Sequence, residues 1–301
     1  MSATDLPRTI DQYLARLRVA LRDADPAMRQ DALYDAEEYL RAELANTPGL
    51  TEAEVVSSVA GSYGAPEEVA DIYRDTEVTV TRALRPPLPP RRESALGRFF
   101  SVAADLRTWS ALFYMLISAA TGVFYFTWAV SGLSLSAGLA VLIVGVPFVI
   151  LFFASVRLLS LVEGRIVETL LGERMPRRPT YPSRGEPILT RIGAMFTDPR
   201  TWSTLVYMLL MLPLGIIYFT LTTAGLSVAL GLIAAPFAQV FGAVGLIRIE
   251  DAEFLLPVWA SPLTAVLGVV LLFALLHLVR AIGRSHGVLA KHLLVKVSRA
   301  D

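Results

Sequence analysis

Hydrophobic and polar positions follow two different patterns along the chain. Up to residue 84, apolar residues such as Tyr13, Leu17 and Leu21 recur every three or four positions, which is typical of amphipathic helices packed in a small domain. Further on, residues 108–131 and 201–224 are predominantly apolar over 24 positions each. About 20 such residues suffice to cross the hydrocarbon core of a membrane. The pattern therefore predicts a soluble helical domain followed by membrane-spanning helices.

Helix-start signals divide the first part into short helices. Asp25-Pro26 places a capping residue before a proline at the first helical position, and Thr51 to Glu54 form a capping box. Gly64-Ala65-Pro66 breaks the chain before a last helix. We therefore expect residues 1–84 to form a helical domain, and the proline-rich stretch after it to be a stiff linker over residues 85–97.

The apolar part contains an internal repeat. The segment from Asp105 to Met115 recurs from Asp198 to Met208, and both copies read Asp-x-Arg-Thr-Trp-Ser-x-Leu-x-Tyr-Met at an offset of 93. Residues 157–171 align with residues 280–294 at the larger offset of 123. The second copy therefore carries an insertion, which we place near 232–261. In each copy we expect a first helix that turns at Gly-Leu-Ser and a second helix that returns, near 135–158 in the first copy.

Basic residues predict the orientation of these helices. Residues 157–200 contain eight arginines and residues 280–301 contain five Lys or Arg, whereas the turn after the first span has none. By the positive-inside rule both basic stretches lie in the cytoplasm, which requires four crossings and not five. Residues 232–261 are then expected to be an external interfacial or re-entrant segment around Pro236.

These patterns together predict the fold class. We expect an all-α protein with a small cytoplasmic helical domain and a four-span transmembrane bundle built from two hairpin repeats. The repeats are assigned to residues 98–178 and 179–301, the second with its external insertion and a cytoplasmic tail. Because no apolar leader segment precedes the first domain, the N-terminus is expected to stay in the cytoplasm, and the basic tail places the C-terminus there as well.

Composition narrows the chemistry. The chain is 54% hydrophobic and 18% charged, and the absence of cysteine excludes disulfides, thiol nucleophiles and iron–sulfur clusters. The three histidines are not spaced as metal ligands, and phosphate loops and nucleophile elbows are missing, so we expect no metal, no cofactor and no enzyme activity. The first 84 residues carry 16 acidic residues against eight arginines, which disfavours direct nucleic-acid binding.

The N-terminal part resembles a known signalling domain. The stripe from Tyr13 to Leu21 and the segment from Tyr63 to Ala70, which reads Tyr-Gly-Ala-Pro-Glu-Glu-Val-Ala, are similar to the HAAS (DUF1700-like) domain. The resemblance implies a cytoplasmic helical domain fused to membrane segments in bacterial signalling proteins, and a PadR-like regulator or other signalling protein as the partner. The candidate docking residues are Gly64, Pro66, Glu67 and Glu68. The alternative is that the glycine and proline only punctuate helices and that the acids are a solvated surface.

Residues 96–296 resemble a second family. The doubled Asp-x-Arg-Thr-Trp motif, the Tyr-Phe-Thr segments and the Leu-Leu pairs are similar to the actinobacterial "putative sensor" transmembrane domain. That resemblance implies a membrane sensor. Where the family has adjacent Glu and Arg after the second helix, this chain has Glu163-Gly164-Arg165.

Three groups of side chains are candidates for function. Two tyrosine–threonine pairs near the outer ends of the first helices could line a pocket for a lipid or an amphiphilic drug, or could be belt and backbone-bonding residues: Tyr125, Thr127, Tyr218 and Thr220. Residues at the end of the second helix could couple to the N-terminal domain, or could lie against anionic lipid: Arg157, Glu163 and Arg165. His277 inside the last span is either functional or neutral and hydrogen-bonded.

The function predicted from the sequence is that of an integral membrane sensor or regulator in the bacterial cytoplasmic membrane. It would couple an envelope or membrane-borne signal to a cytoplasmic partner. The alternative is a transporter or a transporter accessory subunit, because internal repeats are common in transport folds. The sequence leaves the stimulus and the oligomeric state open.

Overall fold

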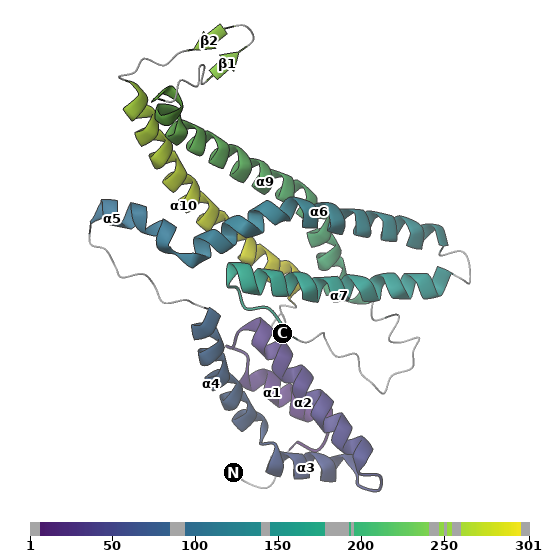
Figure 1. Cartoon of the computed structure of the whole chain (residues 1–301). Helices are drawn as coiled ribbons and strands as arrows, with labels where there is room; N and C mark the ends of the chain where they lie inside the picture. The colour runs from purple at the N-terminus through teal and green to yellow at the C-terminus, as the bar shows by residue number, and fades with distance from the viewer. Residues whose placement is uncertain are drawn as a thin grey trace. The chain divides into compact units, whose positions relative to one another are not determined.

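The structure is a computed structural model, and it is helical apart from one two-stranded hairpin (Figure 1). It describes residues 7–84, 94–139, 145–177, 193, 196–240, 247–249, 252–254 and 260–295. The chain divides into two compact units. The first comprises Met1–Pro86, Ser131–Tyr207 and Gly287–Asp301, and the second comprises Pro87–Val130 and Met208–His286. The first unit therefore joins the N-terminal domain to parts of the apolar helices.

The N-terminal domain consists of four helices whose starts follow the predicted signals. They are α1 (Ile10–Ala20), α2 (Pro26–Asn46), α3 (Glu52–Ser62) and α4 (Pro66–Leu84). Asp25 accepts a hydrogen bond from the Ala27 backbone N–H at 2.8 Å, and Thr51 and Glu54 form both bonds of the capping box. These bonds satisfy backbone N–H groups that a helix start leaves without partners.

An apolar core holds these four helices together. Its buried members are Ile10, Tyr13, Leu14, Leu17, Leu21, Met28, Ala32, Ala36, Leu40, Val55, Val56, Val59, Val69 and Ala70. The Tyr13 hydroxyl donates to the carbonyl of Gly64 at 2.8 Å and so fixes the turn between α3 and α4. Burial, followed by the neighbouring Tyr63, Glu67 and Glu68, raises the pKa of Tyr13, which keeps this hydroxyl protonated as a donor.

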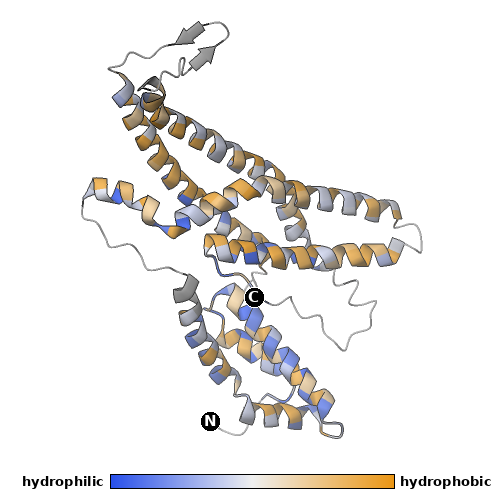
Figure 2. Ribbon diagram, in the orientation of Figure 1, coloured by the Kyte–Doolittle hydropathy of each residue, from blue (hydrophilic) through white to orange (hydrophobic). Residues whose placement is uncertain are grey.

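Four of the described helices are long and apolar enough to cross a membrane. They are α6 (Leu106–Leu139), α7 (Gly145–Leu171), α9 (Pro199–Val240) and α10 (Ser261–Leu294). Apolar residues predominate along all four, whereas α1–α4 alternate between polar and apolar faces (Figure 2). Large side chains such as Leu151 and Val266 point outward from the helices, as lipid-facing residues do. The prediction of an all-α fold with four spans is confirmed.

The predicted turns at Gly-Leu-Ser are wrong, because both first helices continue through them. α6 runs on from Gly132 to Leu139, and α9 runs on from Gly225 to Val240. A Cβ at Gly132 would lie 2.0 Å from the Phe152 ring, and one at Gly225 would lie 2.8 Å from Leu275. The glycines therefore serve close helix packing and do not make turns. The second helix of the first copy begins at Gly145, later than the predicted 135.

The described residues of the insertion belong to the end of α9, a β-hairpin and the start of α10. Residues 232–240 extend α9, with Pro236 inside the helix, and α10 begins at Ser261. Between them, β1 (Ile247–Ile249) pairs antiparallel with β2 (Ala252–Phe254). Residues 232–240 of the expected insertion thus continue a long helix, and the external position of the insertion stays a prediction. The expected linker lies mostly outside the described residues, and Ser94 caps the short helix α5 (Ala95–Phe100).

Within the second unit, α6 and α9 cross at very short range. A Cβ at Gly122 would lie 2.3 Å from the Met211 carbonyl oxygen, and one at Gly215 would lie 2.2 Å from the Ser118 carbonyl oxygen. Gly122 and Gly215 are equivalent positions of the repeat, as are Ser118 and Met211. The repeat thus places one glycine on each helix at the crossing, where only glycine lets the backbones approach this closely.

Candidate functional site

The doubled sequence motif builds the same helix start in both copies. Asp105 accepts a hydrogen bond from the Arg107 backbone N–H at 3.1 Å, and Asp198 accepts one from Arg200 at 3.0 Å. The indole N–H of each motif tryptophan donates to a carbonyl six residues earlier at 2.8 Å: Trp109 to Ala103 and Trp202 to Phe196. Aspartate caps the helix and tryptophan holds the preceding turn, so these residue types have a structural reason in the motif.

The same aspartates also form ion pairs that exchange partners between the copies. Asp105 of the first copy lies 3.0 Å from Arg280 of the second, and Asp198 of the second lies 3.3 Å from Arg157 of the first. Arg157 and Arg280 are equivalent at the offset of 123. Each first helix is therefore fastened to the second helix of the other copy.

The tyrosine of each motif also contacts the second helix of the other copy, but the partner is a different residue type in each case. The Tyr114 hydroxyl lies 2.7 Å from His286 Nε2, and the Tyr207 hydroxyl donates to Glu163 Oε1 at 2.8 Å. All four side chains are buried. Tyr218 adds a second hydroxyl 3.3 Å from His286 Nδ1. Sequence reasoning missed His286, although its alignment with Glu163 at the offset of 123 was a usable signal.

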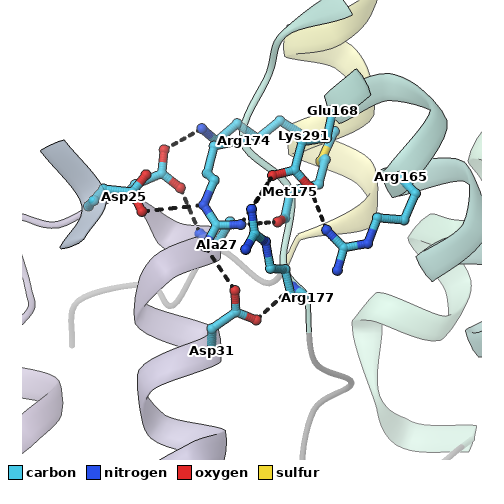
Figure 3. A network of polar contacts seen from close by, with 10 residues as sticks. Asp25, Ala27, Asp31, Arg165, Glu168, Arg174, Met175, Arg177 and Lys291 are labelled. Atoms are coloured by element: carbon cyan, nitrogen blue, oxygen red, sulfur yellow. Dashed lines mark hydrogen bonds and ion pairs between the residues drawn. The ribbon is translucent and has the colours of Figure 1, made fainter. Parts of the chain in front are cut away.

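A polar network joins the N-terminal domain to α7 and α10 within the first unit (Figure 3). Its centre is Arg174, which follows α7. The guanidinium of Arg174 pairs with Asp31 of α2 at 3.1 Å, Glu77 of α4 at 3.3 Å and Glu168 of α7 at 3.3 Å. One central cation therefore contacts carboxylates from three helices.

Further contacts extend the network on both sides of Arg174. The Arg177 backbone N–H donates to Asp31 at 2.6 Å, and Lys291 of α10 forms an ion pair with Asp25. Arg200 at the start of α9 donates to Gln30 at 2.8 Å. The N-terminal domain thus contacts the connector after α7, the start of α9 and the end of α10.

Burial and charge act in opposite directions on Arg174. Its side chain is 10% exposed, and those of Asp31 and Glu168 are 8% and 5% exposed. Burial alone would lower the pKa of the guanidinium, but the charges of Asp31, Glu77 and Glu168 raise it above its ordinary value. Arg174 is therefore held as a cation among carboxylates that depend on it for charge compensation.

The predicted pocket residues lie on different helix faces. Tyr125 and Tyr218 are buried, whereas Thr127 and Thr220 are exposed. Two residues along an α-helix are about 200° apart, so each tyrosine and its threonine point in nearly opposite directions. The structure brings Tyr218 to His286, while Thr127 and Thr220 lie on the exposed faces of their helices.

The predicted coupling residues lie beside the network and not at its centre. Arg157 pairs with Asp198, Glu163 accepts from Tyr207, and Arg165 pairs with Glu168 at 2.7 Å. Sequence reasoning missed Arg174, Arg177 and Lys291. The available signal was the charge contrast between the acidic domain and the eight arginines of 157–200, but that contrast does not single out one arginine.

The remaining candidates have structural roles in the described residues. Gly64 has a φ of +116°, which favours glycine, and Pro66 opens α4. Glu67 and Glu68 are exposed, and Glu68 also accepts a hydrogen bond from the Ala65 backbone N–H at 3.1 Å.

His277 meets the short helix α5. Its Nε2 lies 3.0 Å from the carbonyl oxygen of Phe99, and its ring stacks on the Phe99 ring at a centroid distance of 5.5 Å. These contacts give His277 a role in packing α5 against α10.

Comparison with known proteins identifies the membrane part. Residues 114–294 match the model of a family described as "Putative sensor", which covers more than half of the chain. The match does not include the N-terminal domain, and no curated protein and no solved structure matches the chain. Together with the four apolar helices, it shows a multi-pass membrane protein of sensor type. The chain belongs to the Putative sensor family.

Proposed function

We propose that this protein senses a membrane-borne or envelope signal and passes it to a cytoplasmic partner through its N-terminal domain. The observation that carries the proposal is the Arg174 network, which ties α2 and α4 to α7. A signal must favour one of two arrangements to have any effect. In the first arrangement, Asp31 and Glu77 of the N-terminal domain are paired with Arg174. In the second, these pairs are broken and the domain is released from α7.

The polar character of the network supports a reversible contact. Arg174, Arg177 and Lys291 face Asp31, Glu77 and Asp25, and this contact is made by charges and hydrogen bonds. Such pairs cost desolvation when formed and regain hydration when separated, so their net contribution is small compared with their number. Arg157, Glu163 and Arg165 stand next to the network and are proposed as coupling residues.

The orientation and the partner belong to this proposal as well. Positive-inside charge favours cytoplasmic termini, and the resemblance to the HAAS domain favours a bacterial signalling partner such as a PadR-like regulator. Glu67 and Glu68, which are exposed, are proposed to face that partner. Tyr125 and Tyr218 remain the proposed receiving residues, with Thr127 and Thr220 on the outward face of their helices.

Crosslinking and capture from native membranes test the proposal. We would compare the wild-type chain, a chain lacking residues 1–84 and the variant Arg174→Gln, with Arg22→Gln as the matched control because Arg22 is exposed and pairs only with its neighbour Asp23 in the described structure. We expect a cytoplasmic regulator that is lost with the deletion and changes in amount in Arg174→Gln but not in Arg22→Gln. Capture that is identical in all four proteins would contradict the proposal.

A transporter or an accessory subunit is the second candidate, and the duplicated hairpin favours it. In that case a transport protein would be captured through the membrane domain, and deletion of residues 1–84 would make no difference. Substrate movement by the purified chain in liposomes would establish it directly.

A further inference from the structure

The start of α9 is fastened to α7 at two points. Asp198, which caps α9, pairs with Arg157 at 3.3 Å, and Tyr207 donates to Glu163 at 2.8 Å. The second contact is buried, since Tyr207 is 1% and Glu163 is 2% exposed. A hydrogen bond to a buried carboxylate is among the stronger polar contacts in a protein. Any displacement of α9 along α7 must therefore strain or break this bond.

The same stretch of α7 also holds the network. Glu168 lies five residues after Glu163 and contacts Arg174, Arg165 and Arg177. Between the two glutamates, the Cβ position of Gly164 lies 3.4 Å from Met175, so the connector that carries Arg174 packs directly on the helix. α7 therefore offers Glu163 to Tyr207 of α9 and Glu168 to Arg174, and Arg174 in turn contacts Asp31 and Glu77 of the N-terminal domain.

We propose that the Tyr207–Glu163 hydrogen bond is the positioning contact through which the state of α9 sets the docking of the N-terminal domain. This inference rests on the proposed function, because it assigns the step that links the bundle to the Arg174 network. Glu163 acts through α7 and through Glu168, which lies five residues further along the same helix. While the bond is made, α7 is held in the register at which Glu168 reaches Arg174.

The repeat supplies a matched control for this contact. Tyr114 occupies the position of Tyr207 in the other copy, and its hydroxyl meets His286. Both tyrosines are 1% exposed, so Tyr→Phe removes one buried hydroxyl in each case. The hydrogen bond between Tyr114 and His286 lies within the second unit, whereas Tyr207, Glu163 and Glu168 belong to the first. A general loss of bundle stability would appear in both variants, whereas a positioning role would appear only in Tyr207→Phe.

Docking of the N-terminal domain can be measured with a crosslink between two residues that the chain already contains. Lys291 pairs with Asp25 across the junction, and Lys291 and Lys296 are the only lysines. A water-soluble carbodiimide joins a carboxylate to a neighbouring amine with loss of water, so the initial rate of the Asp25–Lys291 amide bond reports the docked arrangement. The full-length protein in lipid nanodiscs is treated with carbodiimide, digested and analysed by mass spectrometry. Melting temperatures of the same samples report bundle stability.

We expect Tyr207→Phe to lower the crosslinking rate about threefold or more, and Tyr114→Phe to leave it unchanged. Glu163→Gln, which keeps an acceptor oxygen for Tyr207, should retain more crosslinking than Glu163→Leu. Arg174→Gln gives the reference for release, about tenfold or more. If Arg174→Gln lowers the rate but the two tyrosine variants behave alike, this inference is wrong and the junction stands. If Arg174→Gln has no effect either, the proposed function fails with it.

Discussion

The N-terminal domain and the membrane helices are held together in different ways. In the domain, the large apolar side chains turn inward, and Leu17 and Leu40 are fully buried. In the membrane helices many of them turn outward, as Leu151 at 68% exposure shows. In the N-terminal domain, the hydrophobic effect drives the burial of these apolar side chains. In lipid that force is missing, since the hydrocarbon is as apolar as the side chains.

This difference shows which residues determine how the helices pack in each region. The domain is specified by an apolar core and by helix caps. The bundle is specified by glycines at close crossings, such as Gly122 and Gly215, and by polar pairs that exchange between the copies, such as Asp105 with Arg280. At the junction between the two regions, the Arg174 network joins carboxylates of the N-terminal domain to a carboxylate of the apolar helix α7.

The largest expected effect is at this junction. Arg174→Met keeps an unbranched, flexible side chain but removes the guanidinium, which leaves Asp31, Glu77 and Glu168 without their common cation. Removal of one partner from a buried ion pair costs about 3–5 kcal/mol. We expect the N-terminal domain to become sensitive to protease in the full-length protein. Arg22→Met, at an arginine that is 75% exposed, should leave protease resistance unchanged. Equal sensitivity of both variants would contradict a central role for Arg174.

The next effect separates a water-excluding core from a lipid-facing surface. Leu17→Ala should destabilise the N-terminal domain by about 2–5 kcal/mol, because it leaves a cavity in a closed core. Leu151→Ala on α7 removes the same atoms from a side chain that faces outward and should change stability by less than about 0.5 kcal/mol. Urea midpoints from pulse proteolysis of the full-length protein measure both. Similar costs for the two changes would remove the contrast between the regions.

Glycines within one helix give a smaller and equally specific test. Gly122→Ala places a methyl group 2.3 Å from a backbone carbonyl of α9, which cannot move aside as a side chain can, so overpacking of about 1–3 kcal/mol is expected. Gly138→Ala in the same helix has nothing within 4 Å and should be neutral or stabilising by about 0.5–1 kcal/mol. Thermal unfolding in detergent compares them. A neutral Gly122→Ala would argue against the close crossing.

The smallest effect concerns a helix cap in the N-terminal domain. Hydrogen bonds from the backbone and side chain of Thr51 lower the pKa of Glu54. A lowered pKa stabilises the folded state above the ordinary pKa of glutamate, and this contribution is lost as the pH falls through the lowered value. Thr51→Ala should cost about 1 kcal/mol at neutral pH and should weaken the acid dependence. Stability curves from pH 3 to about pH 7 for both proteins measure this, in the range where carboxylates titrate. An unchanged acid dependence would contradict the capping box.

Local signals predicted much of the fold. Asp25 and Thr51 correctly predicted where their helices begin, and the length of the apolar runs predicted the four spans. Helix caps and apolar runs can be predicted because each depends on residues that are close together in sequence. The Gly-Leu-Ser turns were predicted wrongly because a glycine in isolation looks like a helix breaker. Only the neighbouring helix shows that Gly132 makes room for Phe152.

The candidate site was predicted less well, for a physical reason. The network depends on contacts between residues far apart in the chain, such as Asp31 with Arg174 and Asp25 with Lys291. Composition showed that an acidic domain precedes a basic connector, but eight arginines of 157–200 carry the same charge. What distinguishes Arg174 is burial between three helices, and burial of that kind follows from the tertiary fold.

The N-terminal domain docks on α7 and α10 through the Arg174 network and the neighbouring pair of Asp25 with Lys291. Carbodiimide crosslinking of Asp25 to Lys291 in native membranes tests this docking most directly, because both residues are native and partly exposed. We predict that the wild-type chain forms this crosslink and that Arg174→Gln loses most of it while Arg22→Gln keeps it. A wild-type chain without the crosslink, or equal crosslinking in all three proteins, would contradict the account.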